Sequence, residues 1–151
     1  MFGVLTRGGL MRRVDAARVE AALAAAEKQT SGEIRVSVAP FFWGSVENAA
    51  ALAFERLGMT RTRDRNGVLI FVVPSRHRFR LLGDEGIHAK VGQAFWDEVA
   101  AHMSEHFHAG DFTRGLEAGI AAIGRGLAEH FPHAGDADVN ELPDHIDFGD
   151  T

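Results

Sequence analysis

The 151-residue sequence predicts a single α/β domain in which helices cover both faces of a small mixed sheet. Two observations lead to this prediction. Segments with helical and with strand periodicity alternate along the chain, in the order helix, strand, helix, strand, strand, helix, helix. One of the strands, residues 68–73, is continuously apolar, as expected of a strand that is covered on both faces. The chain also lacks Cys, which excludes a disulfide scaffold and Cys-ligated metals.

The first half of the chain is expected to contain a helix, a strand and a second helix. Residues 13–30 place apolar side chains three and four positions apart, which is the stripe of an amphipathic helix. Residues 34–38 alternate between apolar and polar side chains, which indicates a strand. Ser45 is a suitable N-cap for the second helix, and Gly58 is a suitable end.

The second half is expected to contain two strands and two helices. Gly115, Gly119 and Gly126 fall inside the last helix, where each lowers helix propensity. We therefore expect another helix to pack closely against one of them. The predicted elements are a basic loop over 59–65, strands over 68–73 and 78–83 joined by a turn at 74–77, and helices over 87–108 and 113–131.

The order of these elements predicts which loops meet. A helical crossover joins the first two strands, so we expect them to be parallel, whereas the short turn predicts an antiparallel hairpin. The first two strands then begin at the rim where the third strand ends. Oxygen-bearing side chains from several loops gather at this rim, and such ligands suit a hard cation such as Ca²⁺ or Mg²⁺. The candidate ligands are Glu33, Asp64, Asn66, Asp84, Glu85 and, from the turn between the last two helices, Asp111.

An alternative interpretation of these acids stays open. Asp and Glu are ordinary turn residues, and they also stabilise the first turn of a helix. Asp84 and Glu85 precede a predicted helix and fit that role.

The opposite rim carries aromatic and basic side chains. A helix N-terminus at Ser45 with arginines nearby could hold an anion. Because the sequence has no Gly-rich phosphate loop, we favour a basic turn beside an aromatic plug that closes the core. The residues are Phe41, Phe42, Trp43, Ser75, Arg76, His77 and Arg78.

One motif resembles a zinc site. His102, Glu105 and His106 match H-x-x-E-H, and two His four residues apart share a helix face. Glu129, in the following helix, is an acid that could serve as a further ligand. We favour a solvated helix edge, because short motifs often match by chance. The sequence contains neither G-x-S-x-G nor G-K-[ST].

Acidic residues are concentrated at the end of the chain. After Pro132 there are six acids and neither Lys nor Arg, which leaves 15 acids and 16 bases in residues 1–131. We expect a flexible arm over 1–12, an ordered domain over 13–132 and a disordered acidic tail over 133–151. No apolar run approaches the roughly 20 residues of a membrane span, and the N-terminus lacks the features of a signal peptide. We therefore expect a soluble cytoplasmic protein.

Several segments resemble the TPM domain family, also called DUF477. They are Ser31–Val36 (S-G-E-I-R-V), Arg65–Val72 (R-N-G-V-L-I-F-V), Arg80–Gly86 (R-L-L-G-D-E-G) and Phe107–Gly119 (F-H-A-G-D-F-T-R-G-L-E-A-G). The resemblance implies a three-layer α/β/α sandwich with a sheet of three or four strands and about four helices. It also shows a departure, because the common motif has Asp where this chain has Arg65.

The resemblance also implies candidate functions. Members of the family have been assigned weak acid phosphatase activity, a role in repair of photosystem II, association with membrane protein complexes and, in some cases, Ca²⁺ binding. We expect a divalent-cation-binding interaction module that helps to maintain a protein complex, and a weak metal-dependent acid phosphatase is the alternative. A purely structural interaction module is a third interpretation. The expected partners are proteins, including peripheral contacts with membrane complexes. We expect no nucleic acid and no organic cofactor.

Overall fold

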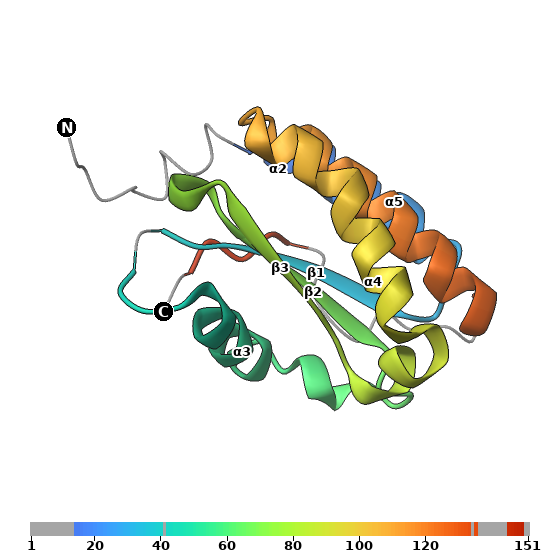
Figure 1. Ribbon diagram of the computed structural model, residues 1–151. Helices are drawn as coiled ribbons and strands as arrows, with labels where there is room; N and C mark the ends of the chain where they lie inside the picture. The colour runs from blue at the N-terminus through green and yellow to red at the C-terminus, as the bar shows by residue number, and fades with distance from the viewer. Residues whose placement is uncertain (1–13, 41, 134, 136–144, 150–151) are drawn as a thin grey trace.

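The computed structural model, which describes residues 14–40, 42–133, 135 and 145–149, has an α/β fold with three layers. Helix α3 covers one face of the central sheet, and helices α2, α4 and α5 cover the other (Figure 1). The helices are α2 (Ala16–Glu27), α3 (Val46–Arg56), α4 (Glu85–His108) and α5 (Phe112–His130), with short 3₁₀ turns η1 (Met59–Arg61) and η2 (Pro74–Arg76). The strands are β1 (Glu33–Val38), β2 (Gly67–Val73) and β3 (Arg78–Gly83).

The sheet has the predicted topology. Its strand order is β1-β2-β3, with β1 parallel to β2 and β2 antiparallel to β3. Glu33 lies opposite Gly67 at the start of the parallel pair, and Val68 lies opposite Gly83 in the hairpin. The first two strands therefore begin at the rim where β3 ends.

The central strand β2 contributes to two hydrophobic clusters, and all of its residues are buried. Val68, Ile70 and Val72 belong to the larger cluster, which also contains the apolar faces of α2, α4 and α5. The intervening Leu69 and Phe71 belong to the smaller cluster, beneath α3. Successive side chains of a strand point to opposite faces, so a strand covered on both sides is apolar at every position.

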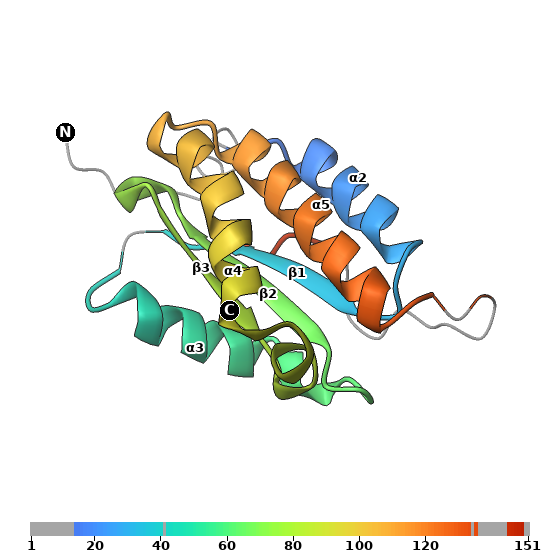
Figure 2. The same cartoon turned by 45° about the vertical axis from the view of Figure 1, so that its right-hand side comes forward.

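Helices α4 and α5 lie side by side and pack through three of the four glycines of α5 (Figure 2). A Cβ atom at Gly115, Gly119 or Gly126 would lie within 3.0 Å of a side chain of α4. The predicted close packing is therefore confirmed, and it involves all three glycines. The α4 side chains that fill these places are Phe107, Met103 and Phe95.

Helix α4 begins two residues earlier than predicted and is interrupted near its start. Asp84 is the N-cap residue, and Gly92 has φ 73° and ψ 177°, outside helical geometry. Glycine adopts this backbone conformation readily because it has no Cβ. The periodicity of 87–108 predicted one continuous helix, but the structure has a break at Gly92.

The expectation that the chain stays unpacked beyond residue 132 is wrong for residues 145–149. Ile146 and Phe148 are buried in the larger cluster, and Asp147 pairs with Ser37 of β1. The prediction rested on the low apolar content of the whole tail and gave no weight to two apolar residues two positions apart, Ile146 and Phe148. The arm expected over 1–12 lies outside the described residues.

The basic loop over 59–65 also differs from the expectation, because it contains η1 and buries Met59.

Candidate functional site

The predicted acidic rim forms where β1 and β2 begin and β3 ends. The Glu33 amide donates a hydrogen bond to the Asn66 carbonyl oxygen at 3.4 Å, and the Asp84 amide donates to the Gly67 carbonyl oxygen at 2.9 Å. Glu33, Asn66 and Asp84 are all buried. The topology thus brings together three of the six candidate ligands from three different segments.

A guanidinium group joins the acids of this rim. Arg65 Nε lies 2.6 Å from Asp84 Oδ2, and Arg65 Nη2 lies 2.9 Å from Asp84 Oδ1. Arg65 Nη1 is also 3.3 Å from Glu85 Oε1. The hydrogen bonds with Asp84 and the charges of both acids raise the pKa of Arg65 above its ordinary value, against the effect of partial desolvation. The rim is therefore built around an internal ion pair.

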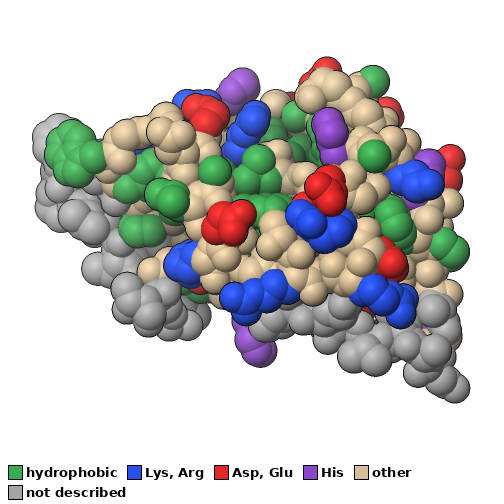
Figure 3. Space-filling model, turned by 90° about the horizontal axis from the view of Figure 1, so that it is seen from below, with side chains coloured by type: hydrophobic (Ala, Val, Ile, Leu, Met, Phe, Trp, Pro, Cys, Tyr) green, Lys and Arg blue, Asp and Glu red, His purple; other side chains and the backbone are tan. Residues whose placement is uncertain are grey.

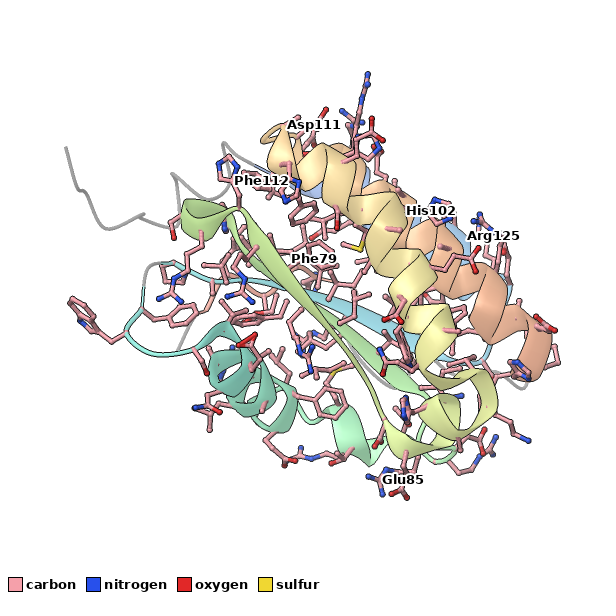
Figure 4. All side chains as sticks on the ribbon, viewed as in Figure 1. Phe79, Glu85, His102, Asp111, Phe112 and Arg125 are labelled. Atoms are coloured by element: carbon pink, nitrogen blue, oxygen red, sulfur yellow. The ribbon has the colours of Figure 1, made fainter. Side chains whose placement is uncertain are left out.

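Asp111 does not join this rim. It caps α5 by accepting a hydrogen bond from the Arg114 amide, and its turn lies beside His77 at the hairpin between β2 and β3. Figure 4 shows Asp111 and Glu85 at opposite ends of the molecule. The 24 residues of α4 carry the chain roughly 30 Å from one rim to the other, so a turn that follows α4 cannot return to the first rim.

The donor set of the rim fits a divalent cation poorly. Both carboxylate oxygens of Asp84 accept hydrogen bonds from Arg65, and Oδ1 also accepts one from the Glu85 amide. Asp64 is half exposed and lies 3.6 Å from Arg63. Within the described ranges, no three His, Asp or Glu side chains are grouped as metal ligands. One feature favours a ligand: Asn66 Oδ1 is buried without a hydrogen-bond partner among the described residues. The cation site therefore stays a prediction.

The aromatic and basic rim at the other end has the geometry expected of a structural plug. Arg76 donates hydrogen bonds to the carbonyl oxygens of Phe42 and Gly44, and its guanidinium lies 4.5 Å from the centre of the Phe42 ring. Phe42 in turn packs against Phe71 of β2. Trp43, by contrast, is 89% exposed. Phe41 lies outside the described residues.

The two His of the H-x-x-E-H motif have different surroundings. His102 lines a small hollow of about 200 Å³ between α4 and α5, with Glu98, Arg125 and Glu129 (Figure 4). His106 lies beside Gly115 and does not line that hollow. This arrangement supports the solvated helix edge favoured from the sequence.

A larger groove, which no sequence motif indicates, runs between β3 and α4. Its volume is about 430 Å³. Five consecutive residues of β3 line it, although their side chains alternate between the two faces of the sheet. The groove therefore follows the backbone edge of the strand. The lining residues are Phe79, Arg80, Leu81, Leu82 and Gly83 of β3 and His88, Gln93, Trp96, Asp97 and Ala100 of α4.

The hydrogen-bond pattern shows which backbone groups of β3 face this edge. The Asp84 amide donates to the Gly67 carbonyl, and residues in an antiparallel pair alternate between hydrogen-bonded and non-hydrogen-bonded positions. Leu82, Arg80 and Arg78 therefore bond to β2. The amide and carbonyl groups of the intervening Phe79 and Leu81, and of Gly83, point away from β2. Within the described chain, no hydrogen bond reaches these outward groups.

Hydrogen bonds and close packing connect the residues at the floor of the groove. Trp96 Nε1 donates a hydrogen bond to His88 Nδ1 at 3.0 Å, so the neutral imidazole carries its hydrogen on Nε2. The Trp96 ring packs against Gly83 so closely that a Cβ atom there would clash with it. Asp97 accepts a hydrogen bond from Gln93 at 3.0 Å. The groove thus combines an apolar wall with fixed polar groups, as ligand grooves commonly do.

Comparison with known proteins identifies the family. The family model described as "TPM domain" matches residues 4–126. The chain belongs to the TPM domain family. The BA42 protein of the psychrophilic bacterium Bizionia argentinensis, solved by NMR, is 36% identical to this TPM domain, with a TM-score of 0.83, and the match covers 92% of this chain and 94% of BA42.

A more distant structure shares the fold. The N-terminal domain of a protein from P. gingivalis, also solved by NMR, matches this TPM domain with a TM-score of 0.63 at 16% identity. That match covers 86% of this chain and 96% of the other. No curated protein matches the chain significantly. Among the described residues of this TPM domain, no helix has the length and hydropathy needed to cross a bilayer.

Proposed function

We propose that this TPM domain is a protein-binding module that accepts an extended segment of a partner protein along the open edge of β3. The observation that supports the proposal is the row of outward backbone groups at Phe79, Leu81 and Gly83, which lies along a groove. Unpaired amide and carbonyl groups at a sheet edge recognise the backbone of another extended chain.

The dimensions of the groove suit a short segment. Five strand residues span roughly 17 Å, so the partner segment would contribute about five or six residues. Alternate side chains of an added strand would point toward α4, where Trp96 and Ala100 provide an apolar wall. Gln93 and Asp97 supply polar contacts at the same wall.

The surface supports a protein partner rather than a polyanion. In the view of Figure 3, basic and acidic side chains are interspersed, and no single-sign patch dominates. Nucleic acid binding depends on clustered Lys and Arg. A protein partner and a cytoplasmic location are both part of this proposal.

The experiment selects extended peptides from a random heptapeptide display library and titrates the selected peptide. The chain has two Trp, so the Trp43→Phe variant leaves Trp96 as the fluorescent reporter at the groove. We expect saturable binding that changes Trp96 emission. If the library yields no binding peptide, or if binding leaves Trp96 unchanged, the proposal is wrong.

Two adjacent alanines of α4 provide a matched pair of variants. Ala100 lines the groove, whereas Ala101 is exposed outside it. Ala100→Arg would fill the groove with a long side chain, and we expect it to weaken peptide binding by about tenfold or more, equivalent to about 1.4 kcal/mol. Ala101→Arg should bind like the parent. Equal binding by both variants would contradict the proposal, and dimerisation that Ala100→Arg abolishes would assign the edge to a second copy of the chain.

The alternative function is a weak metal-dependent acid phosphatase. Such an enzyme needs a cation to neutralise the phosphoryl charge and to activate water. The pairing of Arg65 with Asp84 argues against a cation at the acidic rim. Hydrolysis of p-nitrophenyl phosphate, measured with Ca²⁺, Mg²⁺ or EDTA in the wild type and in Glu33→Gln, distinguishes the two functions. Cation-dependent turnover that Glu33→Gln abolishes would favour the phosphatase.

A further inference from the structure

Arg65 occupies the centre of the junction between the loop before β2 and the first turn of α4. Its side chain makes two hydrogen bonds to Asp84 and approaches Glu85, and its carbonyl oxygen accepts a hydrogen bond from the Ile87 amide at 3.3 Å. One residue therefore connects the loop to the helix through both its side chain and its backbone.

Hydrogen bonds occupy three of the roughly four acceptor positions of the Asp84 carboxylate, and a guanidinium blocks the side on which a metal ion would need both oxygens. Asp84 is 6% exposed, its two oxygens accept from Arg65, and Oδ1 also accepts from the Glu85 amide. A divalent cation would have to displace the guanidinium, since a positive charge at that distance repels the ion. The orientation is also fixed, because a bidentate guanidinium–carboxylate pair holds both groups in one plane.

We infer that the Arg65 guanidinium takes the place of a divalent cation at this rim, so that the TPM domain described here ties its acidic loops together without metal. The charges at this position support the inference. Arg65 supplies the positive charge that faces Asp84 and Glu85. The Arg65→Asp change would remove that charge and add a third carboxylate beside those of Asp84 and Glu85. Several carboxylates that converge on one point repel one another, and a bound Ca²⁺ ion would offset that repulsion.

The backbone at this position favours a shorter side chain. Arg65 has φ 51°, in the left-handed region that Asp and Asn tolerate better than most residues. Gly86 lets the first turn of α4 sit directly on the carbonyl groups of Asp64 and Arg65, where any Cβ atom would clash. The loop conformation is thus fixed by Gly86 and by the backbone, and the Arg65→Asp variant should keep it.

The experiment measures the response of the melting temperature, and of calorimetric titration, to Ca²⁺ and Mg²⁺. We expect no Ca²⁺-dependent change in the wild type. Arg65→Asp should melt at a lower temperature without metal and recover by about 5 °C with millimolar Ca²⁺, because an ion that binds only the folded state stabilises it. The matched control is Arg63→Asp, which makes the same charge change at a side chain that is 85% exposed, and it should not respond.

Two results would overturn the inference. The first is saturable Ca²⁺ binding by the wild type that Asp84→Asn or Glu33→Gln removes, which would show that Glu33 and the unpartnered Asn66 oxygen hold an ion beside Arg65. The second is a folded Arg65→Asp variant whose melting temperature ignores Ca²⁺. If Arg65→Asp does not fold, Arg65→Asn replaces it, and a folded Arg65→Asn variant without a Ca²⁺ response would count in the same way.

Discussion

The two edges of the sheet are treated in opposite ways. At the β1 edge, the Val38 amide donates to the Asp147 carbonyl at 2.7 Å and the Asp147 amide donates to the Val36 carbonyl at 2.9 Å. Residues 145–149 of the chain thereby cover that edge. At the β3 edge, the outward groups of Phe79, Leu81 and Gly83 receive no hydrogen bond from the described residues.

The difference leaves the backbone hydrogen-bonding groups of only one sheet edge, that of β3, without partners among the described residues. An uncovered edge strand invites pairing with another chain, and natural proteins usually protect such edges. Here a buried carboxylate secures the covered edge, because Asp147 accepts hydrogen bonds from Ser37 Oγ at 2.8 Å and from the guanidinium of Arg56. The open edge has no comparable cover among the described residues and instead adjoins a groove. The β3 edge is therefore the one at which the proposed partner segment would add to the sheet.

The largest expected effect is at the covered edge. Phe148 is 7% exposed and belongs to the larger hydrophobic cluster, so Phe148→Ala should lower the free energy of unfolding by about 3 kcal/mol. Urea unfolding followed by circular dichroism measures the change. Leu52→Ala is the control, since Leu52 is 72% exposed and its loss should cost less than about 0.5 kcal/mol. Equal effects of the two changes would mean that residues 145–149 do not pack in solution.

Asp147 should have the next largest effect. Asp147→Ala removes the acceptor of Ser37 and of Arg56, and hydrogen bonds to a charged group contribute about 1.5–3 kcal/mol. We expect a loss of about 2 kcal/mol in urea unfolding. Glu117→Ala, which breaks the more exposed ion pair with Arg18, should cost less than about 1 kcal/mol. A cost for Asp147→Ala no greater than that for Glu117→Ala would contradict a structural role for the buried carboxylate.

The stability that Asp147 contributes should depend on pH. Burial opposes its ionisation, but hydrogen bonds from Arg56 and Ser37 outweigh burial and hold the pKa of Asp147 below its ordinary value of 3.8. A depressed carboxyl pKa contributes stability that is complete above the unfolded pKa and is lost as the pH falls through the folded pKa. The stability difference between wild type and Asp147→Asn should thus be constant near neutral pH and shrink below about pH 4. A difference that grows with acidity would reverse the assigned sign.

The smallest perturbation is the exchange of single amide hydrogens. The Val38 amide is bonded to Asp147, whereas the Leu81 amide points out of the sheet. Both lie in edge strands, and we expect Leu81 to exchange at least about ten times faster than Val38 in NMR hydrogen-exchange measurements. Similar protection of both amides would show that another part of the chain covers β3.

The sequence predicted most of the fold because the signals were local. The apolar run of β2, the Ser45 cap and the left-handed Gly58 each depend on a few neighbouring residues, and each is found as expected. The candidate site was harder to predict from the sequence. The strand order predicted that Glu33, Asn66 and Asp84 share one rim, as they do in the structure, but Asp111 was placed at the wrong end because helix length was not considered. The groove could have been anticipated, since no strand follows β3 in the described sheet to cover its far side.

By itself, the sequence determined the strand order, the helices and the charge of each loop, because periodicity and turn chemistry are encoded in neighbouring residues. Tertiary structure decided three matters. It placed Arg65 against Asp84, folded Ile146 and Phe148 back onto β1, and opened the groove beside Trp96. Only the second joins residues far apart in sequence, since Ser37 and Asp147 are 110 positions apart, whereas the groove residues lie between Phe79 and Ala100 and Arg65 and Asp84 are 19 positions apart. Even there, the pairing requires that β2 and β3 first form the hairpin between them.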